Sequence, residues 1–504
     1  MREPPTVAGV TLVRRAIHAA IAVAVIAASA GCTPVPQLAR TPGTAKTSAA
    51  PGGLPGEPGP DAGLSMPVAD PLYPNYGNPC LDVLRYQLNL AWSPQQRELS
   101  GTASLTIRAT KAVNEISLDF SDAYTVDSAT VGGASVRSSR RGNDVVVPAT
   151  LARDARTTFV LTYHGTPRPV PMPSGRGDFP EGLGLRTAPG GEAWTMQEPY
   201  GALTWYPAND QPSDEAIYDI SVTVPKGWAA VAHGQLVGVE SSEAGDTYRW
   251  RAVDPVASYL ATLAVGQYTK LTDSGPRGLP ITYWLRTGKD DYVEPALRKT
   301  PALLAWLEER FGPYPFPTAG VVLVDSLSAM ETQQMVTYGA RLGTQYDFPA
   351  DLDLVEEILL HEFAHQWFGD SVTPKDWRGM WLNEGFAMYA QWLWSVDKGR
   401  NTDAGWVSRA RKSDAESRPV AGPPGNPHPD HFGEHNVYMG PALMLHEIHR
   451  AVGDAAFFAM ARDWVQTQRN QQVDRAGFIA FVNRHTGRDF TALINRWLDS
   501  PTTP

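Results

Sequence analysis

The chain has 504 residues, and its 43 lysine and arginine residues against 53 aspartate and glutamate residues give a net charge of −10. This acidic balance and the lack of a long basic run argue against nucleic acid as a partner. With only two cysteines, the chain cannot be a disulfide-rich scaffold, and its length is enough for two or three domains.

Residues 1–31 have the pattern of a signal peptide, because three arginines precede an almost continuous run of small and apolar residues. The run is short for a transmembrane helix and no other stretch is long enough, so we expect no membrane span in the mature protein. The run ends in Ser29-Ala30-Gly31-Cys32, which resembles the bacterial lipobox. This predicts lipidation of Cys32 and anchoring on the extracellular face of the cell membrane, with plain secretion as the alternative.

Residues 32–69 are rich in Pro, Gly, Ala, Ser and Thr and poor in large apolar residues. This composition cannot bury a core, so we expect a flexible tether. Beyond it only Cys80 remains, which excludes an intramolecular disulfide in the folded part.

Residues 70–272 show the alternation and turn signals of strands and predict an antiparallel β-sandwich. The clearest strand signals are Val83–Leu90, Thr102–Arg108, Ile116–Phe120, Thr158–Tyr163, Tyr218–Val224 and Tyr259–Val265.

Residues 273–453 mix short strands with helical periodicity and predict an α+β domain, followed by a short helical tail at 454–504. The expected helices are Glu294–Phe311, Leu352–Phe368, Leu382–Val396, Ala442–Val452 and Asp454–Thr467.

Two histidines lie four residues apart in the expected helix 352–368. An apolar stripe through Leu354 and Ile358 continues at helical spacing into His361 and His365, so both imidazoles face one side. That arrangement suits a tetrahedral zinc ion. Glu362 lies beside this face, where it can take a proton from a metal-bound water without being a ligand.

Glu384 lies in the first turn of the next expected helix and is the candidate third ligand. Three protein ligands leave one position open, which is typical of a catalytic rather than a structural zinc site. A bare HExxH pattern arises by composition in roughly one chain in a hundred of this length, but the helix phase and the position of Glu384 argue against chance.

Several motifs together resemble the aminopeptidase N and leukotriene hydrolase family of zinc metallopeptidases, the gluzincin aminopeptidases, over roughly residues 76–453. The motifs are Glu198-Pro199, Ser328-Ala329-Met330-Glu331-Thr332, His361-Glu362-Phe363-Ala364-His365, Trp381-Leu382-Asn383-Glu384-Gly385 and Val437-Tyr438. The resemblance implies a β-sandwich followed by a thermolysin-like catalytic domain, and one zinc ion per chain.

The resemblance also implies a binding site for the substrate's free amine. Glu331 matches the carboxylate that holds the α-ammonium group, and Ala329 and Met330 belong to the same substrate-binding motif, usually Gly-Ala-Met-Glu-Asn. Glu198 matches a second partner for the amine, with the neighbouring Gln197 as its rival.

Tyr438 matches the family's tyrosine that stabilises the oxyanion, and we expect it just ahead of a helix that begins near Pro441. The family often has a basic residue followed by Gly where this chain has Gly440 and Pro441. It also commonly continues into a large C-terminal helical domain, so the end of this chain at Pro504 predicts a more open cleft.

The function implied is removal of N-terminal residues from peptides that carry a free N-terminus. Two alternatives remain at this stage. One is a zinc endopeptidase or other hydrolase that needs no free amine, and the other is a lipid-anchored binding protein that has lost catalysis.

Overall fold

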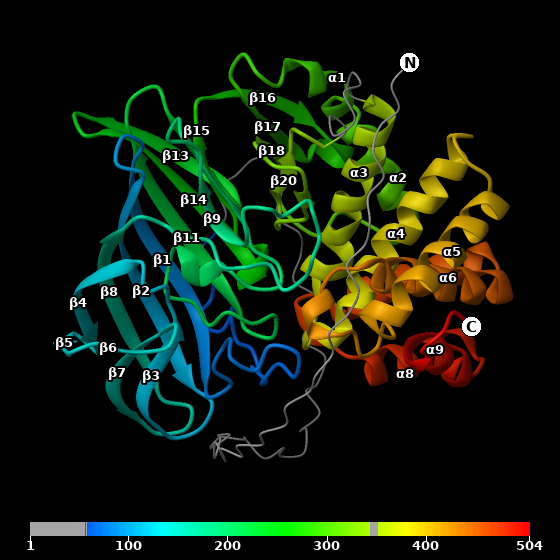
Figure 1. Cartoon of the computed structure of the whole chain (residues 1–504), viewed down its shortest axis with the longest axis horizontal. Helices are drawn as coiled ribbons and strands as arrows, with labels where there is room; N and C mark the ends of the chain where they lie inside the picture. The colour runs from blue at the N-terminus through cyan, green and yellow to red at the C-terminus, as the bar shows by residue number, and fades with distance from the viewer. Residues whose placement is uncertain (1–55, 57, 343–350) are drawn as a thin grey trace, which may run out of the picture. The chain divides into compact units, whose positions relative to one another are not determined.

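The computed structural model describes residue 56 and residues 58–342 and 351–504, all within one compact unit, Lys46–Pro504 (Figure 1). The predicted signal peptide, Cys32 and most of the predicted tether lie outside the described residues. Within the described part, no helix is both long and apolar enough to cross a membrane.

The N-terminal part is built on an eight-stranded sheet with the order β13-β14-β11-β1-β2-β8-β4-β5. Its strands are β1 (Leu81–Ser93), β2 (Glu98–Ala109), β4 (Tyr124–Val131), β5 (Ala134–Ser135), β8 (Arg156–Gly165), β11 (Glu215–Val224), β13 (Gln235–Ser242) and β14 (Gly245–Ala257).

Strand β1 shows why these segments pair. From Tyr86 to Trp92, every second side chain is buried while those between are more exposed, so one face of the sheet is apolar. The pairs in this sheet are antiparallel except that β1 runs parallel to β11, so the expectation of a wholly antiparallel sandwich is wrong at this pair. The two strands are far apart in sequence, and a parallel pair requires such a long connection.

Two smaller sheets cover the apolar face. They are β12-β15-β10-β9 and β3-β7-β6, with β3 (Val113–Asp119), β6 (Ser139–Arg141), β7 (Asp144–Leu151), β9 (Gly184–Thr187), β10 (Ala193–Met196), β12 (Ala229–Ala232) and β15 (Leu263–Gly266).

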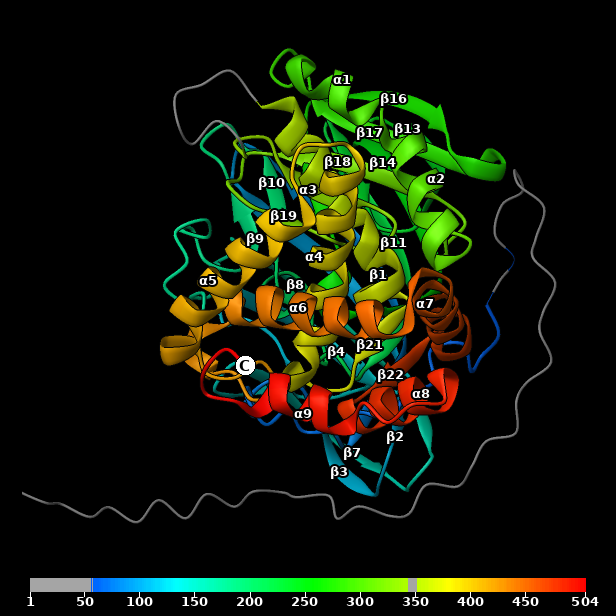
Figure 2. The same ribbon diagram turned by 90° about the vertical axis from the view of Figure 1, so that its right-hand side faces the viewer.

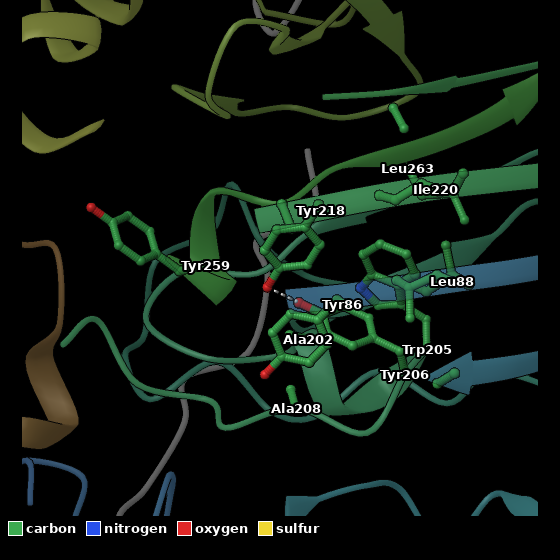
Figure 3. Close-up of a cluster of buried hydrophobic side chains, with 14 of the residues drawn as sticks. Tyr86, Leu88, Ala202, Trp205, Tyr206, Ala208, Tyr218, Ile220, Tyr259 and Leu263 are labelled. Carbon is green, nitrogen blue, oxygen red and sulfur yellow. Dashed lines mark hydrogen bonds between the residues drawn. The ribbon is translucent and has the colours of Figure 1, made fainter. Parts of the chain in front are cut away.

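The core between these sheets is rich in tyrosine (Figure 3). The rings of Tyr86 and Tyr218 stack in register across β1 and β11, with centroids 4.7 Å apart. The hydroxyls of Tyr206 and Tyr218 lie 3.0 Å apart and satisfy each other inside the apolar cluster. Each ring thus contributes buried area while its polar end keeps a partner.

The C-terminal part has a five-stranded sheet with the order β16-β17-β18-β20-β19. Its strands are β16 (Tyr268–Ser274), β17 (Pro280–Arg286), β18 (Ala319–Val324), β19 (Ala329–Met330) and β20 (Val336–Gly339). The central pairs β17/β18 and β18/β20 are parallel, and β19 forms an antiparallel edge. The predicted class, a β-rich domain followed by an α+β domain, is confirmed.

Helices lie beside this sheet, on the right in Figure 1 and facing the viewer in Figure 2. They are α1 (Glu294–Leu297), α2 (Thr300–Phe311), α3 (Leu352–His365), α4 (Met380–Asp397), α5 (Asp403–Ala421), α6 (His435–Val452), α7 (Asp454–Gln468), α8 (Arg475–Thr486) and α9 (Thr491–Asp499). Helix α5 was not among the expected helices, because its residues are mostly polar and include Pro419.

Residues 454–504 are not a separate tail. They form α7, α8, α9 and the strand β22 (Gln471–Val473), which pairs in parallel with β21 (Val372–Pro374). Phe478 of α8 makes edge contacts with Trp381 and Phe386 of α4, with ring centroids 5.4 and 6.0 Å apart. This segment therefore belongs to the same core as α4.

The last residues of the predicted tether pack on the β domain. Ser65 is buried, its backbone N–H faces Asp82, and its carbonyl accepts a hydrogen bond of 2.8 Å from Arg108. A Cβ on Gly63 would lie 2.2 Å from the Leu84 carbonyl oxygen, so only glycine fits at this approach. Gly63 and Ser65, which the predicted tether included, therefore pack in the folded part of the chain.

Candidate metal centre and active site

The three predicted ligands meet at one point. His361 Nε2 lies 3.2 Å from Glu384 Oε2, His365 Nε2 lies 3.3 Å from the same oxygen, and the two nitrogens are 3.1 Å apart. All three side chains are buried. A cation at this point could accept a lone pair from both imidazole nitrogens and from the carboxylate oxygen together.

These distances fit a zinc ion. Tetrahedral zinc with bonds of about 2.0–2.1 Å to nitrogen and oxygen separates its ligand atoms by about 3.3 Å. The three observed separations lie within 0.2 Å of that value. Two histidines and one glutamate are also a usual donor set for catalytic zinc, so the site holds one zinc ion.

The end of α3 orients His365. After this residue the chain makes a wide turn, Gln366–Asp370, in which Gly369 has φ 128° and directs the chain back toward the helix. The Phe368 carbonyl then lies 3.1 Å from His365 Nδ1. An Nδ1–H that donates to this carbonyl leaves the Nε2 lone pair for the metal. This orienting group was not predicted, although a glycine at position 369 is the kind of residue that allows such a turn.

Helix α3 begins at Leu352, as predicted, and Asp351 caps it, because its carboxylate accepts from the backbone N–H groups of residues 353 and 354. The apolar stripe differs from the prediction. Leu354 is exposed rather than part of a buried stripe, whereas Ile358, His361 and His365 line the cavity described below.

Helix α4 begins at Met380, so Glu384 is its fifth residue and lies beyond the first turn. The next residue, Gly385, allows α6 to approach closely, because a Cβ there would lie 2.5 Å from the Cβ of Pro441. The helix that carries the third ligand is thus fitted directly against the helix that carries Tyr438.

Helix α6 begins at His435, six residues before the predicted start, and Pro441 lies inside it. Tyr438 is therefore in the first turn rather than ahead of the helix. Its ring lies nearly parallel to the imidazole of His361, with centroids 6.1 Å apart.

The metal site opens into a cavity of about 600 Å³. Its lining includes residues from both domains, among them Glu198, Ala329, Met330, Glu331, Glu362 and Tyr438. The edge strand β19 forms one wall, and Gln366 connects this wall to α3 by donating a hydrogen bond of 2.8 Å to the Glu331 carbonyl.

Two carboxylates that line this cavity each have one buried oxygen without a hydrogen-bond donor from the described part of the chain. Among the described residues, none donates to the buried Oε1 of Glu331 or of Glu198. Burial raises the pKa of both groups, and in Glu198 the nearby carboxylate of Glu331 adds to the rise. Buried carboxylates in this arrangement favour a cationic ligand.

The structure does not bring Gln197 into the cavity. Its side chain is fully buried in the β domain, where Nε2 donates to the Ser258 carbonyl at 2.7 Å and Oε1 accepts from Trp205 at 2.8 Å. With both ends of the amide engaged, Gln197 has nothing to offer a substrate.

Glu362 and Tyr438 complete the cavity around the metal ligands. Burial raises the pKa of Glu362 well above its ordinary value, although His365 opposes the rise. Burial likewise raises the pKa of Tyr438, so its hydroxyl keeps its proton and can donate a hydrogen bond.

Models of known families match both domains. The Peptidase family M1 domain matches residues 295–497, and the Peptidase M1 N-terminal domain matches residues 83–260. The chain belongs to the peptidase M1 family.

Among individual M1 relatives, aminopeptidase N of Acetobacter pasteurianus is 26% identical over 323 residues, which cover 60% of this chain and 88% of that protein. Glutamyl aminopeptidase of Rattus norvegicus is 30% identical over 213 residues, or 40% of this chain. The match spans only 22% of the glutamyl aminopeptidase.

Solved M1 structures align with this chain over almost their whole length. An M1 zinc metallopeptidase from Deinococcus radiodurans, a mutant bound to a Tyr-Ser-Ala substrate, has a TM-score of 0.76 and 28% identity. The comparison covers 87% of this chain and 98% of that one. A two-domain M1 zinc metallopeptidase mutant bound to L-tryptophan has a TM-score of 0.76 and 29% identity over 87% of this chain and 99% of that one.

Departures from the usual M1 motifs have local structural reasons. Thr332 is buried, and its hydroxyl lies 2.8 Å from that of Thr337 inside the sheet, away from the cavity. At Gly440, where a basic residue is expected, a Cβ would lie 2.6 Å from the guanidinium of Arg418. Arg418 and Asp414 form a buried ion pair, with Nε 2.6 Å from Oδ2. This pair fills the space that a larger side chain at position 440 would need.

Proposed function

We propose that this protein is a zinc aminopeptidase, which removes N-terminal residues from peptides that carry a free N-terminus. The observation that carries the proposal is a pair of buried carboxylate oxygens, Oε1 of Glu331 and Oε1 of Glu198, in the same cavity as the metal ligands. No residue that the structure describes donates a hydrogen bond to either oxygen. A substrate α-ammonium group supplies both the positive charge and the hydrogen-bond donors that these oxygens lack.

The anchored amine determines which bond is cut. With the ammonium group held between Glu331 and Glu198, the first peptide bond is the one brought to the metal ligands, and more distant bonds are not aligned. Strand β19 is at the edge of its sheet among the described residues, so Ala329 and Met330 offer backbone groups along which an extended peptide can lie.

When bound, zinc polarises the scissile carbonyl and lowers the pKa of a coordinated water, so that attack proceeds near neutral pH. Glu362 accepts the proton released during attack and returns it to the leaving nitrogen. Tyr438 donates its hydroxyl hydrogen to the carbonyl oxygen as that oxygen becomes negative. Phe368, through its carbonyl, keeps His365 in the tautomer that offers Nε2.

Two findings on relatives support the choice of substrate. The aminopeptidase N of Acetobacter pasteurianus is matched over 88% of its length, and the structurally similar Deinococcus protein was solved with a tripeptide substrate. A cavity of about 600 Å³ is of a size that accommodates a short peptide segment.

Replacement of Glu331 by Gln tests the proposal. This change keeps the shape of the side chain but removes the charge that faces the ammonium group, so we expect kcat/KM for aminoacyl fluorogenic amides to fall by about 10²-fold or more. Hydrolysis is measured on a panel of free-amine substrates and on their acetylated forms, which the wild type should leave uncut. The exposed Glu309→Gln variant is the control and should match the wild type.

Other outcomes identify the competing functions. Cleavage that ignores acetylation and survives Glu331→Gln would favour a zinc endopeptidase or another hydrolase. Metal-loaded, folded protein that binds free-amine peptides and cleaves none of the panel would favour a binding protein.

We further propose that the protein is exported and anchored to the outer face of the cell membrane through a lipid on Cys32. The support is the sequence pattern alone, a basic and then apolar segment followed by a lipobox-like motif. A single aliphatic chain holds a protein at a membrane weakly, so stable anchoring needs more than one chain.

Replacement of Cys32 by Ser should release the protein from the membrane fraction. The full-length protein is expressed in a bacterium with radiolabelled palmitate, and both the label and the membrane association should be lost in the variant. Wild-type protein found unlabelled in the medium would instead support plain secretion.

A further inference from the structure

A loop of the β domain reaches the active site, although no motif marked it in the sequence. Residues 175–179 line the cavity together with residues of α3, α4 and α6. Arg176 and Asp178 form a two-pronged ion pair, with Nε 3.1 Å from Oδ1 and Nη2 2.7 Å from Oδ2. The guanidinium also lies over the ring of Phe179, 5.2 Å from its centroid. These contacts fix its plane.

The remaining nitrogen of Arg176 is directed at α6. Nη1 donates to the Gly433 carbonyl at 3.0 Å and lies 3.5 Å from the hydroxyl oxygen of Tyr438. Gly433 has φ 68°, and a Cβ there would lie 2.5 Å from Nη1, so glycine lets the guanidinium come close.

This contact determines where the proton of Tyr438 points. A guanidinium has donors only, so it can face just the lone pairs of the phenol oxygen. The O–H bond must then point away from Arg176, toward the metal ligands, where the Tyr438 hydroxyl also meets the carboxylate of Glu384. The nearby positive charge also favours negative charge building up on an oxygen bound to this hydroxyl.

The same ion pair also holds the substrate-binding wall. Ser328, which stands where the M1 motif usually has Gly, donates its hydroxyl hydrogen to Asp178 Oδ2 at 2.9 Å. Burial opposes ionisation of Asp178, but its bonds to Arg176 keep the pKa of this carboxyl below its ordinary value, so it remains an acceptor. Asp178 therefore connects the start of β19 to the group that faces Tyr438.

We propose that Arg176, held by Asp178, is a positioning residue that aims the Tyr438 hydroxyl at the developing oxyanion, and that Ser328 couples this device to the substrate-binding strand. The inference deepens the proposed aminopeptidase function and rests on it. It makes the β domain a part of the catalytic apparatus rather than only a support for it.

A double-mutant cycle tests the coupling. Arg176→Gln is expected to lower kcat by about tenfold, because the Tyr438 hydroxyl that Arg176 positions stabilises the oxyanion only in the transition state. Any change of KM, through Asp178 and Ser328, should be smaller than the change of kcat. Tyr438→Phe alone should lower kcat by about 10²-fold. In the Tyr438→Phe background, Arg176→Gln should change kcat by less than about twofold, since the group it positions is gone.

Matched variants separate positioning from folding. Arg176→Lys keeps the charge without the two-pronged geometry and should give an intermediate kcat. The exposed Arg168, which pairs with Asp122 on the same domain, is the control, and Arg168→Gln should leave kcat unchanged. Independent losses in the cycle, or an effect of Arg176→Gln on KM alone, would overturn the inference.

A readout that does not need activity distinguishes failure of this inference from failure of the proposed function. A fluorotyrosine is introduced at position 438, and its fluorine resonance should shift in Arg176→Gln and stay in place in Arg168→Gln. Wild-type protein that cuts no aminoacyl amide refutes the function, whereas an unmoved resonance refutes the Arg176 contact.

Discussion

Replacement of Glu362 by Gln is expected to lower kcat for aminoacyl amides by about 10³-fold or more, while KM stays close to that of the wild type. Glutamine has nearly the same shape but cannot accept the proton of the attacking water, and loss of a general base costs typically 10²–10⁴-fold. Glu362 is buried beside the metal ligands without being one of them. The measurement is steady-state hydrolysis of the best substrate of the panel.

The metal content of this variant is the internal control. Because Glu362 is not a ligand, Glu362→Gln should bind one zinc ion per chain, as the wild type does, and should unfold at a similar temperature. The matched variant Glu357→Gln, from the same helix but outside the cavity lining, should keep full activity. Retention of wild-type kcat in Glu362→Gln would remove the proposed role of this residue.

Removal of the metal is expected to abolish hydrolysis and to lower the free energy of unfolding by about 4 kcal/mol under conditions where free zinc is about 1,000 times its dissociation constant. Without zinc, the nitrogens of His361 and His365 and the carboxylate of Glu384 lose the cation that they coordinate, and its binding free energy no longer stabilises the fold. Thermal unfolding and hydrolysis are followed with a chelator and again after zinc is restored.

Two variants make this measurement specific. His365→Ala should resemble the chelated protein, and the chelator should have no further effect on it. Glu362→Gln should lose stability with the chelator as the wild type does, although it is inactive throughout. A wild type that stays active and equally stable after complete removal of zinc would contradict the assignment of the site.

Local patterns were enough to predict the metal site. The spacing of His361 and His365 on an amphipathic helix places both imidazoles on one side, since helical geometry relates residues four apart whatever the fold. Strand alternation in β1 likewise predicted a buried face that the structure contains. Prediction failed where tertiary contacts override local signals. The start of α6 was expected near Pro441, since proline favours the first turn of a helix, but Pro441 lies inside α6, where it packs against Gly385.

Contacts between residues that are far apart in the sequence determine which other side chains line the active site. Gln197 and Glu198 are adjacent in sequence, yet the amide of Gln197 is taken up by Ser258 and Trp205 while Glu198 faces the cavity. Nothing in the sequence around Arg176 distinguishes it from an ordinary loop arginine. It contacts Gly433 and Tyr438 only because the two domains close on one cavity.

Sequence patterns predicted His361 and His365 as metal ligands, Glu362 as general base, and a β-rich domain followed by an α+β domain, because these predictions depend on spacing within single elements. The tertiary structure was needed to show which residues of the β domain reach the cavity, which group orients His365, and that residues 454–504 share a core with α4. The reason is physical: contacts between distant segments depend on how side chains fit together and satisfy one another's hydrogen bonds, and no local pattern encodes that fit.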